Sequence, residues 1–179
     1  MKKKIILISC AVVCVVVAVL SFTVIVPSVK HNKAVDLMNI GNYKDAQTIL
    51  EELDADKYKE EIYECKYKQA CELFASKSYK EAEKRFDDIV EYKESKDYIK
   101  KCKYYIALDL YNNKNYEEAE KGFNEISEYE DSADYIEKCR YSMAKDFFNK
   151  KNYEKAATLF KKAKDFEDSK DLYTKCMLL

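Results

Sequence analysis

The sequence predicts an all-α chain: an N-terminal transmembrane helix, an α-solenoid of about four helix-turn-helix repeats, and a C-terminal capping helix. Three observations support this prediction. The 179 residues include only 2 Gly and 1 Pro, too few for the tight turns of a sandwich, a barrel or a Rossmann sheet. The chain opens with a long uncharged stretch. A set of tyrosines, alanines and cysteines then recurs every 36 or 37 residues.

The first element is the uncharged stretch, residues 5–26, which is long enough to cross a membrane. Its 22 residues would form roughly 33 Å of helix. Three lysines precede it at 2–4, against Lys30 and Lys33 after it, and this bias favours a cytoplasmic N-terminus. A cleaved signal peptide is the alternative, although its apolar region would be shorter, about 7 to 15 residues.

We therefore predict a single-pass protein of the cell membrane. Residues 1–4 form its cytoplasmic tail, 5–27 its transmembrane helix, and 28–179 an extracytoplasmic repeat body. Three of the 32 basic residues precede the membrane segment and none of the 33 acidic residues does, so the body carries a small excess of acid. Its charges alternate in sign and cannot neutralise a run of phosphates, which argues against a nucleic-acid partner.

The body repeats itself, and five kinds of position keep the period. They are Tyr43, Tyr79, Tyr116 and Tyr153; Ala46, Ala82, Ala119 and Ala156; Leu50, Phe86, Phe123 and Phe160; Ala34, Ala70, Ala107 and Ala144; and Cys65, Cys102, Cys139 and Cys176. Units of this length bury their apolar faces against their neighbours in a solenoid. We place the repeats at about 30–57, 58–94, 95–131 and 132–168, before a capping helix at 169–179.

Each repeat contains two helical patterns in succession. In the third repeat, the first helix presents one apolar face: Ile99, Cys102, Ile106 and Leu110. Ser95 is expected to cap this helix with its hydroxyl, as are the equivalent residues Ser132 and Ser169. Asparagines within 112–115 predict a turn, and a second helix then begins at Tyr116.

At these positions the chain resembles the tetratricopeptide repeat family, over about residues 30–179. The fourth repeat matches best, through Ala144, Phe147, Tyr153, Ala156, Phe160 and Ala163. The first repeat is the weakest match. Two departures are the period, which exceeds the usual 34 residues, and a Tyr-x-Asp-Ser turn, as at 129–132, in place of the closing proline. This variant resembles repeats in single-pass membrane proteins of Gram-positive bacteria.

The resemblance implies protein or peptide binding and no chemistry of its own. We therefore predict a membrane-anchored, extracytoplasmic binding scaffold that is not an enzyme and needs no cofactor or metal. The only histidine, His31, cannot form a triad or a metal cluster by itself. The alternative is a structural subunit or spacer of a larger membrane complex without a groove ligand. The apolar residues at 177–179 hint at this alternative.

The resemblance also implies a binding surface, because the first helix of each pair lines the concave face in that family. Two groove positions, seven residues apart, carry aromatic side chains in three repeats: Tyr67 and Phe74, Tyr104 and Tyr111, and Tyr141 and Phe148. Aromatic rings give a peptide a large contact area at little cost in side-chain entropy. The alternative is that these rings pack one repeat against the next.

The cysteines of the body can be interpreted in two ways, as disulfide partners or as free thiols. An exported chain can form disulfides. However, equivalent positions on stacked helices lie roughly 8 to 10 Å apart, beyond the roughly 7 Å that a bridge tolerates between Cα atoms. We therefore predict that Cys65, Cys102, Cys139 and Cys176 are free thiols that act as small buried packing residues.

Overall fold

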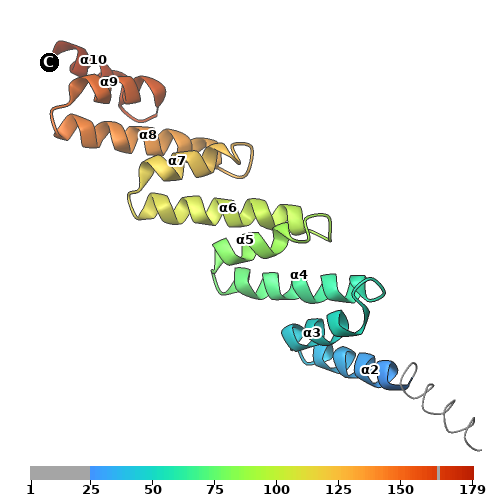
Figure 1. The fold of residues 1–179 in the computed structure, drawn as a ribbon. Helices are drawn as coiled ribbons and strands as arrows, with labels where there is room; N and C mark the ends of the chain where they lie inside the picture. Colours follow the sequence, from blue (N-terminus) through green and yellow to red (C-terminus); the bar gives the residue numbers. More distant parts are fainter. Residues whose placement is uncertain (1–24, 165) are drawn as a thin grey trace, which may run out of the picture. The chain divides into compact units, whose positions relative to one another are not determined.

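The computed structural model describes residues 25–164 and 166–179, and all its regular elements are helical (Figure 1). No strand occurs in these two ranges, so the all-α prediction is confirmed for them. The helices are α2 (Val26–Asn39), α3 (Tyr43–Asp54), α4 (Lys59–Ala75), α5 (Tyr79–Asp87), α6 (Ser95–Asn112), α7 (Tyr116–Asn124), α8 (Ser132–Asn149), α9 (Tyr153–Lys162) and α10 (Ser169–Leu178). The described helices alternate a longer first and a shorter second helix in a repeat-like arrangement, and α10 follows α9. A capping role for α10 stays a prediction.

The predicted membrane segment falls almost entirely outside the described residues, which begin at Ile25. Among the helices that the structure does describe, none is both long and apolar enough to cross a bilayer. Helix α2 begins at Val26 and carries Pro27 in its first turn. Proline is tolerated there because the first N–H groups of a helix have no partner within it.

The chain divides into two compact units, residues 1–69 and 70–179. In the first unit, α2 packs on α3, and the start of α4 completes a small core. Its buried residues are Ala34, Ala46, Leu50, Ile62 and Cys65. His31 stacks on Tyr58, with ring centroids 4.6 Å apart, and its Nε2 lies 3.0 Å from the Glu61 carboxylate. The only histidine is therefore used in local packing.

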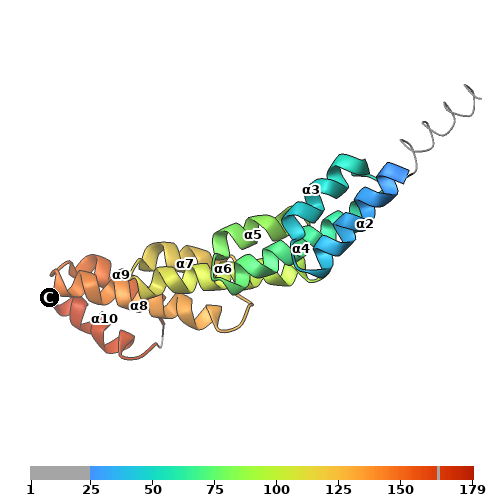
Figure 2. The ribbon, with the colours of Figure 1, turned by 90° about the horizontal axis from the view of Figure 1, so that it is seen from below.

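In the second unit, the helices from α5 to α10 stack in chain order, each against the next (Figures 1 and 2). The second helix of each pair buries the repeated alanine and phenylalanine, as the period predicts, and α9 also buries Ala157. Phe86, Phe123 and Phe160 are among the largest fully buried side chains of the described chain. Gly122 allows α7 to approach α6 closely, because a Cβ at that position would lie 2.9 Å from the Cβ of Ala107.

The turn inside each pair is the same hydrogen-bonded motif in every repeat. In the third repeat, the Lys114 N–H donates to the Tyr111 carbonyl and the Asn115 N–H to the Leu110 carbonyl, at 2.9 Å each. This Schellman pattern needs a left-handed residue after the helix, where glycine is preferred. Only the first repeat has glycine there, and the left-handed residues are Gly41 (φ 82°), Lys77 (φ 63°), Lys114 (φ 62°) and Lys151 (φ 62°).

The turn between pairs contains the Tyr-x-Asp-Ser variant, and here the predicted capping role of serine is wrong. Ser95, Ser132 and Ser169 are the first helical residues and are fully buried, and the N-cap positions are Glu94, Asp131 and Asp168. The hydroxyls of Ser95 and Ser132 have no hydrogen-bond partner among the described residues. The Ser169 hydroxyl donates to the Phe166 carbonyl at 2.6 Å.

The cysteines of the described chain are free thiols. Those at the repeated position are all buried: Cys65, Cys102, Cys139 and Cys176. Burial, the largest cause, raises the pKa of Cys65 to about 11 and the pKa values of Cys102 and Cys139 to about 12. A thiol held neutral in this way is a poor nucleophile and serves as a packing residue.

Candidate functional site

The six predicted groove residues form two sets, and the first contacts the turns between pairs. The Tyr104 hydroxyl donates to the Asp131 carboxylate, and the Tyr141 hydroxyl donates to Asp168, both at 2.6 Å. Tyr67, the equivalent residue in the first unit, is buried. Burial and then these hydrogen bonds raise the pKa values of Tyr104 and Tyr141 well above the ordinary tyrosine value. The hydroxyls therefore stay protonated and act as donors.

The second set contacts the beginning of the second helix of its own repeat. Each ring lies 5.4 Å, centroid to centroid, from the tyrosine that starts that helix, at an angle of about 60°. The three contacts are Phe74 with Tyr79, Tyr111 with Tyr116, and Phe148 with Tyr153. Such tilted and edge-to-face contacts stabilise packed aromatic pairs.

All six side chains are at least half-buried, and contacts with other aromatic rings are made by Phe74, Tyr104, Tyr111, Tyr141 and Phe148. For example, Tyr111 also contacts Tyr135 of α8 edge to face at 5.1 Å, and Tyr135 stacks on Phe123 at 4.8 Å. These contacts correspond to the packing alternative. A binding role for the six residues stays a prediction.

A hollow of about 460 Å³ opens beside one of the six, Phe74. The end of α4, the following turn, the start of α5 and the middle of α6 form its walls. It is lined by Phe74, Ala75, Lys77, Tyr79, Tyr105 and Asp109. Tyr105 stacks on Tyr79, with centroids 4.8 Å apart and an angle of 14°, and it is 37% exposed. This hollow offers aromatic surface and a carboxylate to a ligand.

Sequence reasoning missed Tyr105 and Asp109. Tyr105 does not follow the period, since the equivalent residues are Lys68, Ser142 and Leu179. Asp109 does follow it, with an acidic residue in every repeat: Asp36, Glu72, Asp109 and Asp146. All four are exposed. This recurring acidic position was the sequence pattern that could have indicated Asp109. It was hard to recognise because the chain has 33 acidic residues, many of them expected on helix surfaces.

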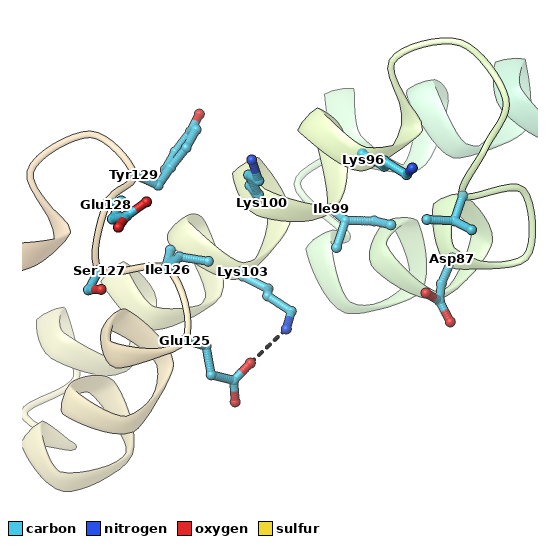
Figure 3. Close-up of a pocket in the computed structure, with 11 residues that line it drawn as sticks. Asp87, Lys96, Ile99, Lys100, Lys103, Glu125, Ile126, Ser127, Glu128 and Tyr129 are labelled. Atoms are coloured by element: carbon cyan, nitrogen blue, oxygen red, sulfur yellow. Dashed lines mark hydrogen bonds and ion pairs between the residues drawn. The ribbon is translucent and has the colours of Figure 1, made fainter.

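A second hollow, of about 610 Å³, lies at the other end of α6, against the turns that precede α6 and α8 (Figure 3). It holds three lysines and three acids around the apolar side chains of Val90, Ile99 and Ile126. Lys103 pairs with Glu125 at 2.7 Å, and this hydrogen bond raises the lysine pKa. Lys96 pairs with Glu91 at 2.7 Å. Three of the six charged side chains that line this hollow are therefore paired: Lys96, Lys103 and Glu125.

The third hollow, of about 700 Å³, lies where α10 ends, beside the turn that precedes α9. Lys151, Tyr153 and Leu179 line it, in the positions that Lys77, Tyr79 and Tyr105 hold in the first hollow. The last three residues are exposed: Met177 at 64%, Leu178 at 82% and Leu179 at 66%. This end of α10 is therefore apolar and open.

Within the described ranges, no group of three His, Cys, Asp or Glu side chains is placed to hold a metal ion. The three hollows present hydrogen-bonding groups, charged side chains and aromatic rings. Groups of these kinds are common at surfaces that bind another protein.

Comparison with known proteins gives a family match, which lies in the fourth repeat. Residues 141–163 match the sequence pattern of the tetratricopeptide repeat. This segment covers the second half of α8 and all of α9, which is the helix pair of the fourth repeat. No curated protein matches the chain. The matched segment and the helical pairs that repeat around it together support a tetratricopeptide-like family for this chain.

Proposed function

We propose that the protein is a membrane-anchored, extracytoplasmic scaffold that binds a protein or peptide along the first helices of its repeats. The tetratricopeptide match at 141–163 is the observation that carries this proposal. Repeats of this kind generally mediate contacts between proteins through an extended surface. The proposal includes no catalytic activity.

The membrane anchor rests on the sequence alone. Residues 5–26 carry no charge, and three lysines precede them. Alkaline extraction of the native membranes tests the anchor, and protease treatment of intact cells tests the orientation. We expect the protein to stay with the membrane and its body to be digested. Release at high pH would reject the anchor, and protection of the body would reject the orientation.

The scaffold is tested by photo-crosslinking in the native membrane. A photoreactive residue at Tyr105, on a first helix, is compared with one at Glu118, an exposed position on the second helix α7. We expect one defined partner to be captured from position 105 and not from 118. Equal capture from both positions, or from neither, would contradict binding along the first helices.

The alternative is a structural subunit that joins a larger membrane complex through the end of its repeats. The exposed Met177, Leu178 and Leu179 favour it. A photoreactive residue at Leu178 distinguishes the two functions. Capture of a partner from position 178, with none from 105, would support the structural subunit.

A further inference from the structure

The aromatic hollow beside Phe74 has one unusual member. Of the 16 tyrosines, all of which lie in the described ranges, only Tyr105 is exposed. Its ring contacts three others: it stacks on Tyr79, and it meets Phe74 at 5.9 Å and Tyr104 at 5.6 Å edge to face. Phe74, Tyr79 and Tyr105 are also in mutual contact, so neighbouring rings support Tyr105 while part of it stays exposed.

A carboxylate lies beside this exposed ring. Asp109 follows Tyr105 by four residues on α6, which places both side chains on the same helix face. Asp109 is exposed, and its carboxylate forms no ion pair among the described residues. An aromatic face and a free carboxylate in one hollow both attract a cation.

Other tyrosine rings of the second unit already carry a cationic side chain over one face. Lysine ammonium groups lie over several tyrosine rings of the second unit, among them Lys138 over Tyr135 at 4.2 Å and Lys101 over Tyr98 at 4.8 Å. No such contact is found at Tyr105 within the described part of the chain. Lys77 lines the same hollow, on its left-handed turn, but neither pairs with Asp109 nor lies over a ring.

We propose that the hollow formed by Phe74, Tyr79, Tyr105 and Asp109 receives an arginine side chain of the bound protein or peptide. This inference rests on the proposed binding function and names the chemistry that the partner must present. A guanidinium group can stack on the Tyr105 ring while two of its N–H groups donate to the Asp109 carboxylate. A lysine has a point charge and no planar face, so it fits this hollow less well.

Charge complementarity selects this occupant over an acidic segment. Exposed acids recur on the first helices of the second unit at Glu72, Asp109 and Asp146, and none of them forms an ion pair among the described residues. An acidic segment that reached these three positions would meet like charges, although α6 also carries lysines nearer its start, at Lys96, Lys100, Lys101 and Lys103. Lys77 opposes an arginine at the rim, so its removal is expected to strengthen binding.

The test uses the full chain in lipid nanodiscs, with its tyrosine rings labelled with carbon-13 for NMR. The probes are blocked pentapeptides, acetyl-Gly-Ala-X-Ala-Gly-amide, with X as Arg, Lys or Gln. We expect the Arg peptide to shift the Tyr105 and Tyr79 signals, the Lys peptide to bind more weakly, and the Gln peptide to leave them unchanged. Tyr105→Phe identifies the Tyr105 signal while it retains the ring.

Matched variants separate the hollow from the general charge of the surface. Asp109→Asn is expected to weaken binding of the Arg peptide by up to about fivefold, on the scale of one exposed ion pair. Asp146→Asn removes the same charge at the same helix position one repeat later, beside Ser142, and should leave binding within twofold. Lys77→Gly, which suits the left-handed turn, should tighten binding, whereas Lys114→Gly should not.

Three results would overturn the inference: no shift with the Arg peptide, equal shifts with the Gln peptide, or equal weakening by Asp109→Asn and Asp146→Asn. Failure here is distinguishable from failure of the proposed function. A partner captured at position 105 by a protein that ignores the Arg peptide keeps the scaffold and rejects the arginine. Absence of capture at every position rejects the scaffold itself.

Discussion

The third repeat (α6 and α7) and the fourth (α8 and α9) share three buried core positions but differ at positions beside them. Both place a first-helix alanine, a second-helix alanine and a phenylalanine in the core: Ala107, Ala119 and Phe123 against Ala144, Ala156 and Phe160. At two neighbouring positions, Tyr105 and Gly122 of the third repeat correspond to Ser142 and Leu159 of the fourth. Positions that must fit the next repeat are constant, whereas positions beside them vary. Specificity is therefore expected at the positions that break the period.

The largest expected effect tests whether the two cores are equivalent. Phe123→Ala and Phe160→Ala each empty a fully buried site, and each should lower the free energy of unfolding by about 3–5 kcal/mol. Urea unfolding of the two variants measures this loss. Equal losses support one shared core. A loss below about 1 kcal/mol in either variant would contradict the packing described for that repeat.

The next effect concerns the close approach that is special to the third repeat. Gly122→Ala places a Cβ 2.9 Å from the Cβ of Ala107, which cannot rotate away. The overlap should destabilise the protein by about 1–3 kcal/mol, although alanine is the better helix former. The double variant Gly122→Ala, Ala107→Gly should recover part of that loss. A more stable Gly122→Ala protein would show that α6 and α7 separate readily.

A smaller effect compares the two tyrosine hydroxyls. Tyr104→Phe and Tyr141→Phe each remove a donor to a carboxylate, at a cost of about 1.5 kcal/mol, and the more buried Tyr141 should cost more. The pKa of each tyrosine is raised above the ordinary value of 10.0 in the folded state. Their stabilisation is therefore complete below pH 10 and is lost as the pH rises above it.

Thermal unfolding between pH 8 and pH 11 measures this dependence. Buried cysteines whose pKa values are also raised act in the same direction, so the comparison is between the natural chain and the double Phe variant. The double variant should lose stability less steeply above pH 10. Identical slopes would show that the two hydroxyls ionise equally in the folded and unfolded states.

The smallest expected effect is a gain. Lys114→Gly and Lys151→Gly place glycine at left-handed residues of the third and fourth repeats, both with φ 62°. Each should stabilise the protein by about 0.5–1 kcal/mol, because glycine avoids the clash of a Cβ in this conformation. Gly41→Lys in the first repeat is the reverse change and should destabilise by a similar amount. Thermal melts of the three variants test both signs.

The repeated positions explain why most of the fold could be predicted. A tyrosine starts each second helix, and an alanine and a leucine or phenylalanine follow it on one face. This is a helical pattern, and α7 begins at Tyr116 as expected. Ser95 was assigned wrongly because the same residue type caps helices and fills small buried sites, and only its surroundings decide between the two. Most of the predicted transmembrane helix, residues 5–24, lies outside the described residues, so that helix stays a prediction.

The candidate site was harder to predict because it depends on residues without a period. Phe74 was named for its place in the aromatic series, but the hollow beside it needs Tyr105, which one repeat alone contains. Whether a ring on a first helix faces a groove or a neighbouring helix depends on rotations of a few tens of degrees. Helical spacing in the sequence does not resolve rotations of that size.

The hydrogen bond from Tyr104 to Asp131 has a mechanical consequence. Tyr104 belongs to α6, and Asp131 immediately precedes α8, so this 2.6 Å bond joins successive first helices directly. Tyr141 and Asp168 do the same between α8 and α10. A force that pulls two successive first helices apart must break the bond that joins them. Each hydroxyl–carboxylate bond therefore adds mechanical resistance at its own junction between repeats.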